Sequence, residues 1–149
     1  MKKTLQAVYF CMAALLTPTA AMAGNDAFVF AENPPVGGII KKNDLLFALM
    51  LREPCMLRIP NGNFMLMAAI FNNRSNPDKP DVGCWALTTD PSKAEIIVVG
   101  PTGHVTSGMS LTEFTKASLL ASGDAKVIGP AMTQQQFNDN LREYEKSRR

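Results

Sequence analysis

The chain has 149 residues, of which 46% are hydrophobic and 19% are charged, with 15 basic and 13 acidic side chains. This length predicts one domain, large enough to bury a core without a metal or additional cross-links. The net charge of +2 would fall to zero if Lys2 and Lys3 were removed with a leader segment. A neutral chain gives no electrostatic reason to expect nucleic acid or anionic lipid as a partner.

Residues 1–23 have the pattern of a secretory signal peptide. Lys2 and Lys3 precede an apolar run at residues 7–16, and the segment ends on Ala21-Met22-Ala23, a small-x-small cleavage signal. We expect cleavage after Ala23 and release of residues 24–149 as a single domain, periplasmic or secreted. The apolar run is too short to cross a bilayer, which needs about 20 apolar residues, so we expect no membrane anchor after cleavage.

The chain has three cysteines, and the predicted cleavage separates them by role. Cys11 lies in the apolar run of the leader, where bulky preceding residues disfavour a lipoprotein cleavage site. Cys55 and Cys84 remain as an even pair bound for an oxidising compartment, which predicts a disulfide. The C-x-x-C spacing that zinc and redox pairs prefer is absent. The bridge would close a loop of about 30 residues and contribute roughly 3.5–4 kcal/mol to stability.

The first half of the exported part predicts strands separated by turns. The apolar run at 45–51 shows neither alternation nor a helical stripe, and we favour a strand buried on both faces over a short helix. Residues 55–59 alternate, with Cys55, Leu57 and Ile59 on one face. At 60–63 we expect a turn, with Gly62 free to adopt a positive φ. Other strands are expected at 27–31, 39–40, 64–71 (or a helical turn leading into a strand) and 82–88.

The clearest hairpin lies at residues 94–107. Residues 95–99 are rich in β-branched side chains, and the Gly-Pro-Thr-Gly sequence at 100–103 supplies a four-residue turn. Residues 104–107 form the returning strand.

A first helix is predicted directly after this hairpin. Ser110 to Glu113 fits the S-x-x-E capping box, and apolar residues at helical spacing continue to about Leu120. Residues 125–132, which contain a Gly-Pro pair, are expected to be a connector.

A second helix is predicted at residues 133–149, with Phe137, Leu141 and Tyr144 at helical spacing on one face. The expected fold is therefore α+β. It has a small antiparallel sheet of four to six strands, a core at about residues 27–120, one or two C-terminal helices and one disulfide.

Side chains suited to catalysis are few. His104 is the only histidine, and it follows the hairpin turn, where an exposed ring is the ordinary expectation. No G-x-S-x-G motif is present, and the remaining cysteines are assigned to the disulfide. Met65 and Met67 would project from one side of a strand as soft Cu(I) ligands, but strand methionines usually fill the core. We predict no catalytic residue, no metal site and no cofactor.

The candidate binding residues are aromatic or apolar. We interpret Trp85 as a core ring packed on the disulfide, with partner binding as the alternative, because tryptophan is enriched at interface hot spots. The stripe of Phe137, Leu141 and Tyr144 is a candidate contact for a second copy of the chain. Self-association is therefore a further hypothesis.

Several short motifs resemble small exported proteobacterial and prophage-encoded proteins that carry a Pro-Cys … Gly-Cys-Trp disulfide pattern. The matching segments are Glu53-Pro54-Cys55, Ile59-Pro60-Asn61-Gly62, Gly83-Cys84-Trp85-Ala86-Leu87, Ile96-Ile97-Val98-Val99 and Leu111-Thr112-Glu113-Phe114. The resemblance covers roughly residues 45–115. This chain departs from the pattern in its turn at 98–103 and in its added C-terminal helix. That family has no assigned activity, so the resemblance implies the disulfide and the fold and supplies no chemistry.

These observations favour a non-enzymatic binding protein that acts on another protein or on a component of the cell envelope. One alternative is an inhibitor of a cell-wall hydrolase or a phage-related exclusion factor, since such proteins are also small, exported and disulfide-bonded. An enzyme that uses His104 is the least favoured alternative.

Overall fold

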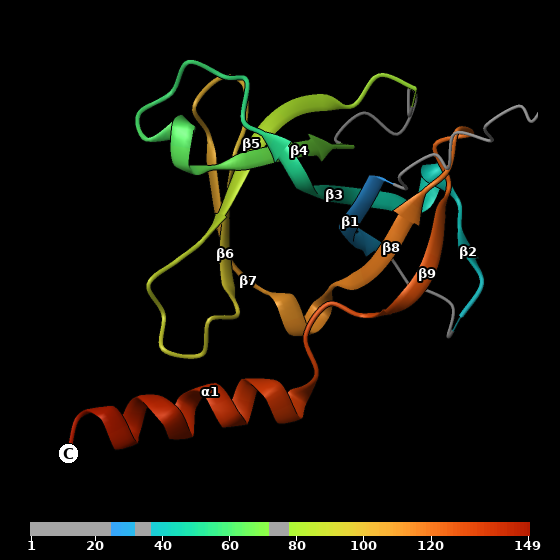
Figure 1. Cartoon of the computed structure of the whole chain (residues 1–149). Helices are drawn as coiled ribbons and strands as arrows, with labels where there is room; N and C mark the ends of the chain where they lie inside the picture. The colour runs from blue at the N-terminus through green and yellow to red at the C-terminus, as the bar shows by residue number, and fades with distance from the viewer. Residues whose placement is uncertain (1–24, 32–36, 72–77) are drawn as a thin grey trace, which may run out of the picture.

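The computed structural model describes residues 25–31, 37–71 and 78–149, and the predicted leader with its cleavage site lies outside them. Within these residues, nine strands form one antiparallel sheet in the order β2-β9-β8-β1-β3-β4-β5-β6-β7, and one α-helix follows (Figure 1). The strands are β1 (Asn25–Ala31), β2 (Ile39–Ile40), β3 (Leu45–Pro54), β4 (Leu66–Ile70), β5 (Asp81–Leu87), β6 (Glu95–Val99), β7 (Val105–Ser110), β8 (Thr115–Leu119) and β9 (Ala125–Pro130). The helix is α1 (Gln134–Ser147). The predicted α+β class is confirmed, and the strands outnumber the four to six expected.

Two of the strands, β8 and β9, were not predicted. They lie in the region for which the sequence predicted a helix and a connector, and that prediction was wrong. The capping box at Ser110 does form: its hydroxyl accepts from the Thr112 N–H at 3.3 Å, and Glu113 Oε2 accepts from the Ser110 N–H at 3.2 Å. It begins only a single 3-10 turn, Leu111–Glu113. The chain then enters β8, which pairs with β1 on one side and β9 on the other. Pairing with two strands outweighs the local preference for helix.

The sheet buries two apolar clusters, and its central strands contribute to both. Along β1, Ala27 and Val29 belong to one cluster, while Phe28 and Phe30 pack against the other. The apolar run of β3 is divided in the same way, because neighbouring residues on a strand project to opposite faces. The interpretation of residues 45–51 as a strand buried on both faces is therefore confirmed.

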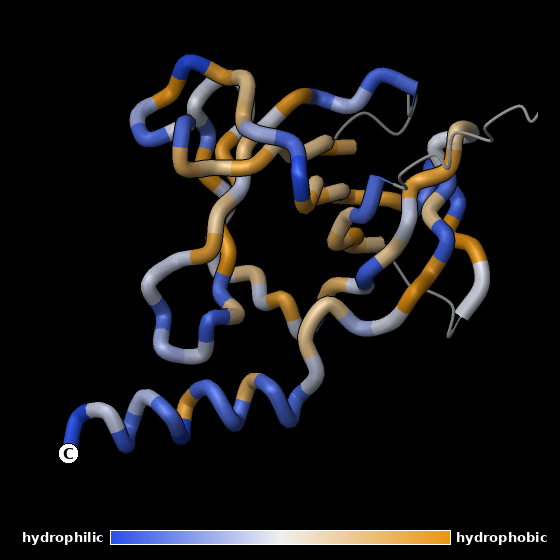
Figure 2. Tube along the Cα trace, viewed as in Figure 1, coloured by the Kyte–Doolittle hydropathy of each residue, from blue (hydrophilic) through white to orange (hydrophobic). Residues whose placement is uncertain are grey.

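The two clusters differ in the size of their side chains. Cluster one includes five alanines and lies where β1, β3, β8 and β9 meet: its buried members are Ala27, Val29, Ala31, Ile40, Leu45, Ala48, Ala117 and Ala125. Cluster two is built from larger side chains: Leu49, Ala68, Ile70, Trp85, Ile96, Val98, Leu111 and Phe114. Figure 2 shows hydrophobic residues along the strands and a largely hydrophilic α1.

Helix α1 is confirmed, and it has little contact with the sheet. Thr133 caps its start: the hydroxyl accepts from the Gln136 N–H at 3.1 Å, and Gln136 Oε1 accepts from the Thr133 N–H at 2.8 Å. No residue of the helix is buried. The Asn140 amide donates to the Ser92 carbonyl at 2.7 Å and ties the helix to the turn between β5 and β6.

Asp124 ties the β8–β9 turn to the segment that precedes β3. Its carboxylate accepts hydrogen bonds from the Lys41 ammonium at 3.0 Å and from the Lys42 backbone N–H at 3.1 Å. These bonds, led by the one from Lys41, favour the charged form and lower the pKa of Asp124 below its ordinary value.

We expect Asp124→Asn to destabilise the protein at neutral pH and to have a smaller effect in acid. A carboxyl whose pKa is depressed by folding contributes stability at pH values above its unfolded pKa, and the contribution is lost as pH falls through the folded pKa. The unfolding free energies of the two proteins in urea should therefore converge below pH 3.8, the ordinary value for this group. A difference that stays constant across the titration would contradict this assignment.

Candidate binding surface

The disulfide joins Cys55 to Cys84, as predicted, with the Cα atoms 5.3 Å apart. Cys55 directly follows β3, whereas Cys84 lies in the middle of β5 and is fully buried. The bridge therefore attaches the connection between β3 and β4 to a strand in the interior of the sheet. It is compatible with an extracellular or periplasmic protein.

This connection, residues 55–65, is here called the stapled loop. Its two ends are joined by a hydrogen bond from the Cys55 N–H to the Met65 carbonyl, 3.0 Å long. Inside it, three further backbone bonds of 3.0–3.1 Å run from Gly62 to Ile59, from Phe64 to Asn61 and from Met65 to Gly62. These bonds close the loop on itself, and the disulfide attaches its first residue to β5.

Gly62 sits at the inner side of the stapled loop and does not adopt the positive φ that is open to a glycine. The left-handed residue is its neighbour Asn61, at φ 60°, and Gly62 begins a 3-10 turn, Gly62–Phe64. A glycine is favoured there, because a Cβ would lie in tight contact with its neighbours, 3.0 Å from the Leu57 carbonyl oxygen and 3.1 Å from Ile59 Cγ1. The glycine serves close packing, and the asparagine makes the turn.

The outer side of the stapled loop presents apolar side chains to solvent. Phe64 is 80% exposed and Met56 is 71% exposed, the largest values among the large hydrophobic residues described. Arg58 is also exposed, while Leu57 and Ile59 are half-buried. The predicted alternation at 55–59 is therefore real, although the segment is a loop and not a strand. The sequence predicted a strand from Phe64 or a helical turn leading into a strand, and the second alternative is confirmed, because Phe64 ends a 3-10 turn ahead of β4. The exposure of Phe64 was not predicted, and the Asn-Gly-Asn sequence before it is the signal that a turn continues.

Trp85 lies in the core. Its side chain is 5% exposed, and its indole N–H donates to the Met50 carbonyl at 2.9 Å. The ring belongs to cluster two and meets Phe28 edge-on, with 6.0 Å between ring centroids. Cys84 is its neighbour on the strand and projects to the opposite face, so the predicted packing of the ring on the disulfide is replaced by packing on Phe28.

The three residues of the predicted stripe lie on α1, which is far in sequence from Trp85 and from the stapled loop. Phe137 and Leu141 are half-buried, and Tyr144 is 42% exposed with the Arg148 guanidinium 5.7 Å from its ring centroid. Tyr144 also lines a hollow between α1 and the turn at 88–93. Self-association through this stripe stays a prediction.

His104 is exposed at the start of the returning hairpin strand. It lines a hollow together with Asp81, Thr102 and Thr106. Among the described residues, no group of three or more His, Cys, Asp or Glu side chains is placed to hold a metal ion. Met65, considered above as a soft ligand, is buried.

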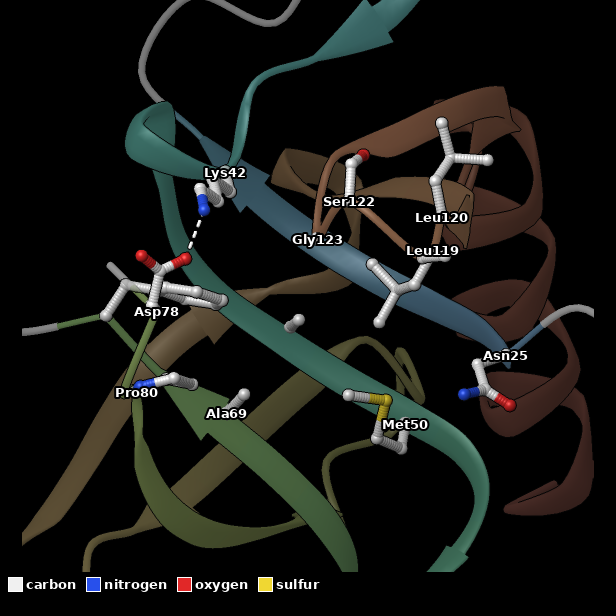
Figure 3. A pocket seen from close by; sticks show the side chains of 13 residues that line it. Asn25, Lys42, Met50, Ala69, Asp78, Pro80, Leu119, Leu120, Ser122 and Gly123 are labelled. Carbon is white, nitrogen blue, oxygen red and sulfur yellow. Dashed lines mark hydrogen bonds and ion pairs between the residues drawn. The ribbon is translucent and has the colours of Figure 1, made fainter. Parts of the chain in front are cut away.

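A groove of about 490 Å³ lies over the face of the sheet formed by cluster one (Figure 3). Its apolar lining comes from β3, β4, β8 and the residues that follow them, and Lys42 and Asp78 form an ion pair at one end. The described lining residues are Asn25, Lys42, Ala48, Met50, Ala69, Phe71, Asp78, Pro80, Leu119, Leu120, Ala121, Ser122 and Gly123.

No protein-family model, curated protein or solved structure matches this chain. The resemblance to small exported proteins therefore stays a prediction. Among the described residues there is no helix with the length and apolar character needed to span a membrane.

Proposed function

We propose that this is a non-enzymatic exported binding protein whose stapled loop contacts a protein or another component of the cell envelope. The observation that carries the proposal is the exposure of Phe64, 80%, on a loop that backbone hydrogen bonds close and a disulfide attaches to β5. Exposing a phenylalanine to water costs free energy that burial in a partner would recover. A loop already held in one conformation loses little entropy when it binds.

Met56 and Arg58 add to this surface. Met56 supplies a second exposed apolar side chain that adapts to the shape of a partner. Arginine and aromatic residues are the types that most often dominate the energy of protein interfaces. The exposed Arg58 and Phe64 thus place both types on one short loop.

A second candidate function is inhibition of a cell-wall hydrolase. Glycoside hydrolases hold a pair of carboxyl groups in a cleft. Arg52 and Arg58 are exposed at the base and on the outer side of the stapled loop, and neither makes an ion pair with a described residue. A loop that offers a phenylalanine and an arginine suits such a cleft. We expect the protein to slow a muramidase such as lysozyme, and Arg58→Glu to abolish the effect; lack of any inhibition by the wild type would exclude this candidate.

The main proposal predicts that Phe64→Ala weakens partner binding without destabilising the fold. A photo-crosslinking residue at position 64 would first capture the partner from envelope extracts, with position 128 as the control, because Ile128 is 55% exposed on β9. Affinity for the captured partner, measured by titration, should then fall about thirtyfold in Phe64→Ala, the effect of losing a hot spot of about 2 kcal/mol.

The control variant Ile128→Ala should bind as the wild type does. The free energy of unfolding of Phe64→Ala should stay within about 0.5 kcal/mol of wild type, as for other surface substitutions. The proposal fails if positions 64 and 128 capture the same proteins equally, or if Phe64→Ala binds normally.

A further inference from the structure

The groove over cluster one has an apolar floor that no helix covers in the described part of the chain. Met50, Phe71 and Leu119 are partly buried and pack against cluster one from this side. The space between them exists because Ala48 and Ala69, on the adjacent strands β3 and β4, are short. A hollow of about 490 Å³ falls in the range that holds small-molecule ligands.

One end of the groove is polar. Figure 3 shows the Lys42–Asp78 ion pair there and Met50 and Asn25 toward the opposite end. Lys42 and Asp78 are the charged residues in the described lining. The groove thus combines a mainly apolar lining with a single cation and a single anion, which lie together at one end.

Lys42 is held in place more firmly than Asp78. Lys42 is held against the β8–β9 turn. Its backbone N–H donates to Asp124, and its Cδ lies 3.3 Å from the point where a Cβ on Gly123 would be. Its side chain is 31% exposed, whereas that of Asp78 is 71% exposed. An ion pair with so exposed a carboxylate contributes little net stability, so another anion can replace Asp78 at small cost.

We propose that the groove binds a long-chain fatty acid, with the alkyl chain over Ala48, Ala69 and Met50 and the carboxylate on Lys42 in place of Asp78. Burial of the chain supplies most of the affinity, and the ammonium selects the charged head group. Recognition depends on this local cation and not on the overall charge of the chain. This site is separate from the stapled loop and does not depend on the function proposed for it.

The test is displacement of a fluorescent fatty acid, cis-parinaric acid, by palmitate in the purified protein. Lys42→Gln should weaken palmitate binding about fivefold, because it removes the partner of the carboxylate. Asp78→Asn should strengthen binding by about threefold, because it removes the competing anion. The matched control is Lys41→Gln: the Lys41 ammonium pairs with Asp124 and does not line the groove, so affinity should not change.

Filling the groove tests the position of the alkyl chain. Ala69→Leu should weaken binding more than tenfold, whereas Ala86→Leu, a half-buried alanine of β5 outside the lining, should not. Thermal unfolding would show whether Ala69→Leu and Ala86→Leu fold. If either of them does not, Lys42→Gln and Asp78→Asn still test the proposal. The proposal is overturned if Lys42→Gln and Asp78→Asn shift affinity in the same direction. It is also overturned if hexadecanol, which has no charge, displaces the probe as well as palmitate does.

Discussion

Reduction of the Cys55–Cys84 disulfide should lower the free energy of unfolding by roughly 3.5–4 kcal/mol, because the bridge restricts the unfolded chain over a loop of about 30 residues. Urea unfolding with and without reductant measures the difference. The double variant Cys55→Ala/Cys84→Ala is the matched control, and reductant should not affect it.

The same change should loosen the stapled loop. Arg58 is exposed in the folded protein, and trypsin should cleave after it faster once the disulfide is reduced, because Cys55 then loses its covalent attachment to β5 and the loop is held by backbone hydrogen bonds only. Equal stability and equal cleavage of the oxidised and reduced proteins would contradict a structural role for the bridge.

Trp85→Ala should destabilise the protein by about 3–5 kcal/mol, the usual cost of removing a large buried ring and leaving a cavity. The indole is 5% exposed, meets Phe28 and donates to the Met50 carbonyl. Trp85 is the only tryptophan, so the variant loses its fluorescence signal, and unfolding is best followed by circular dichroism in urea.

Trp85→Phe separates the two contributions of the indole. It keeps an aromatic ring in cluster two but removes the donor to Met50, and its loss of stability should lie between wild type and Trp85→Ala. If Trp85→Ala cost less than about 1 kcal/mol, the ring would not be a core residue, and its assignment to partner binding would regain support.

Patterns that depend on neighbouring residues in the chain predicted the structure well. The β-branched run before Gly100 and the turn after it formed the expected hairpin, β6 paired with β7. Thr133 capped α1 at the expected place. In each case the decisive interactions join residues close in sequence, so a short window contains the physics that selects the structure.

The same kind of reasoning failed between Ser110 and Pro130. The capping box was identified correctly. Leu111 and Phe114, which were interpreted as part of a helical stripe, instead begin and follow a single 3-10 turn, and both are buried. Beyond them, Thr115–Leu119 becomes a strand because β1, far away in the chain, offers an unpaired edge. Propensity over a short window contains no information about such a partner.

The amino-acid sequence alone was enough to predict the pairing of the cysteines, the hairpin and the last helix and to favour a strand at 45–51, because each depends on composition or on local hydrogen bonds. The sequence also favoured a buried Trp85, but the exposure of Phe64 became evident only from the fold. Burial depends on which strands lie across from a side chain, and these contacts join residues far apart in the chain. For the same reason, only the folded sheet could bring Lys42, Asp78 and the alanines of β3 and β4 together around one groove.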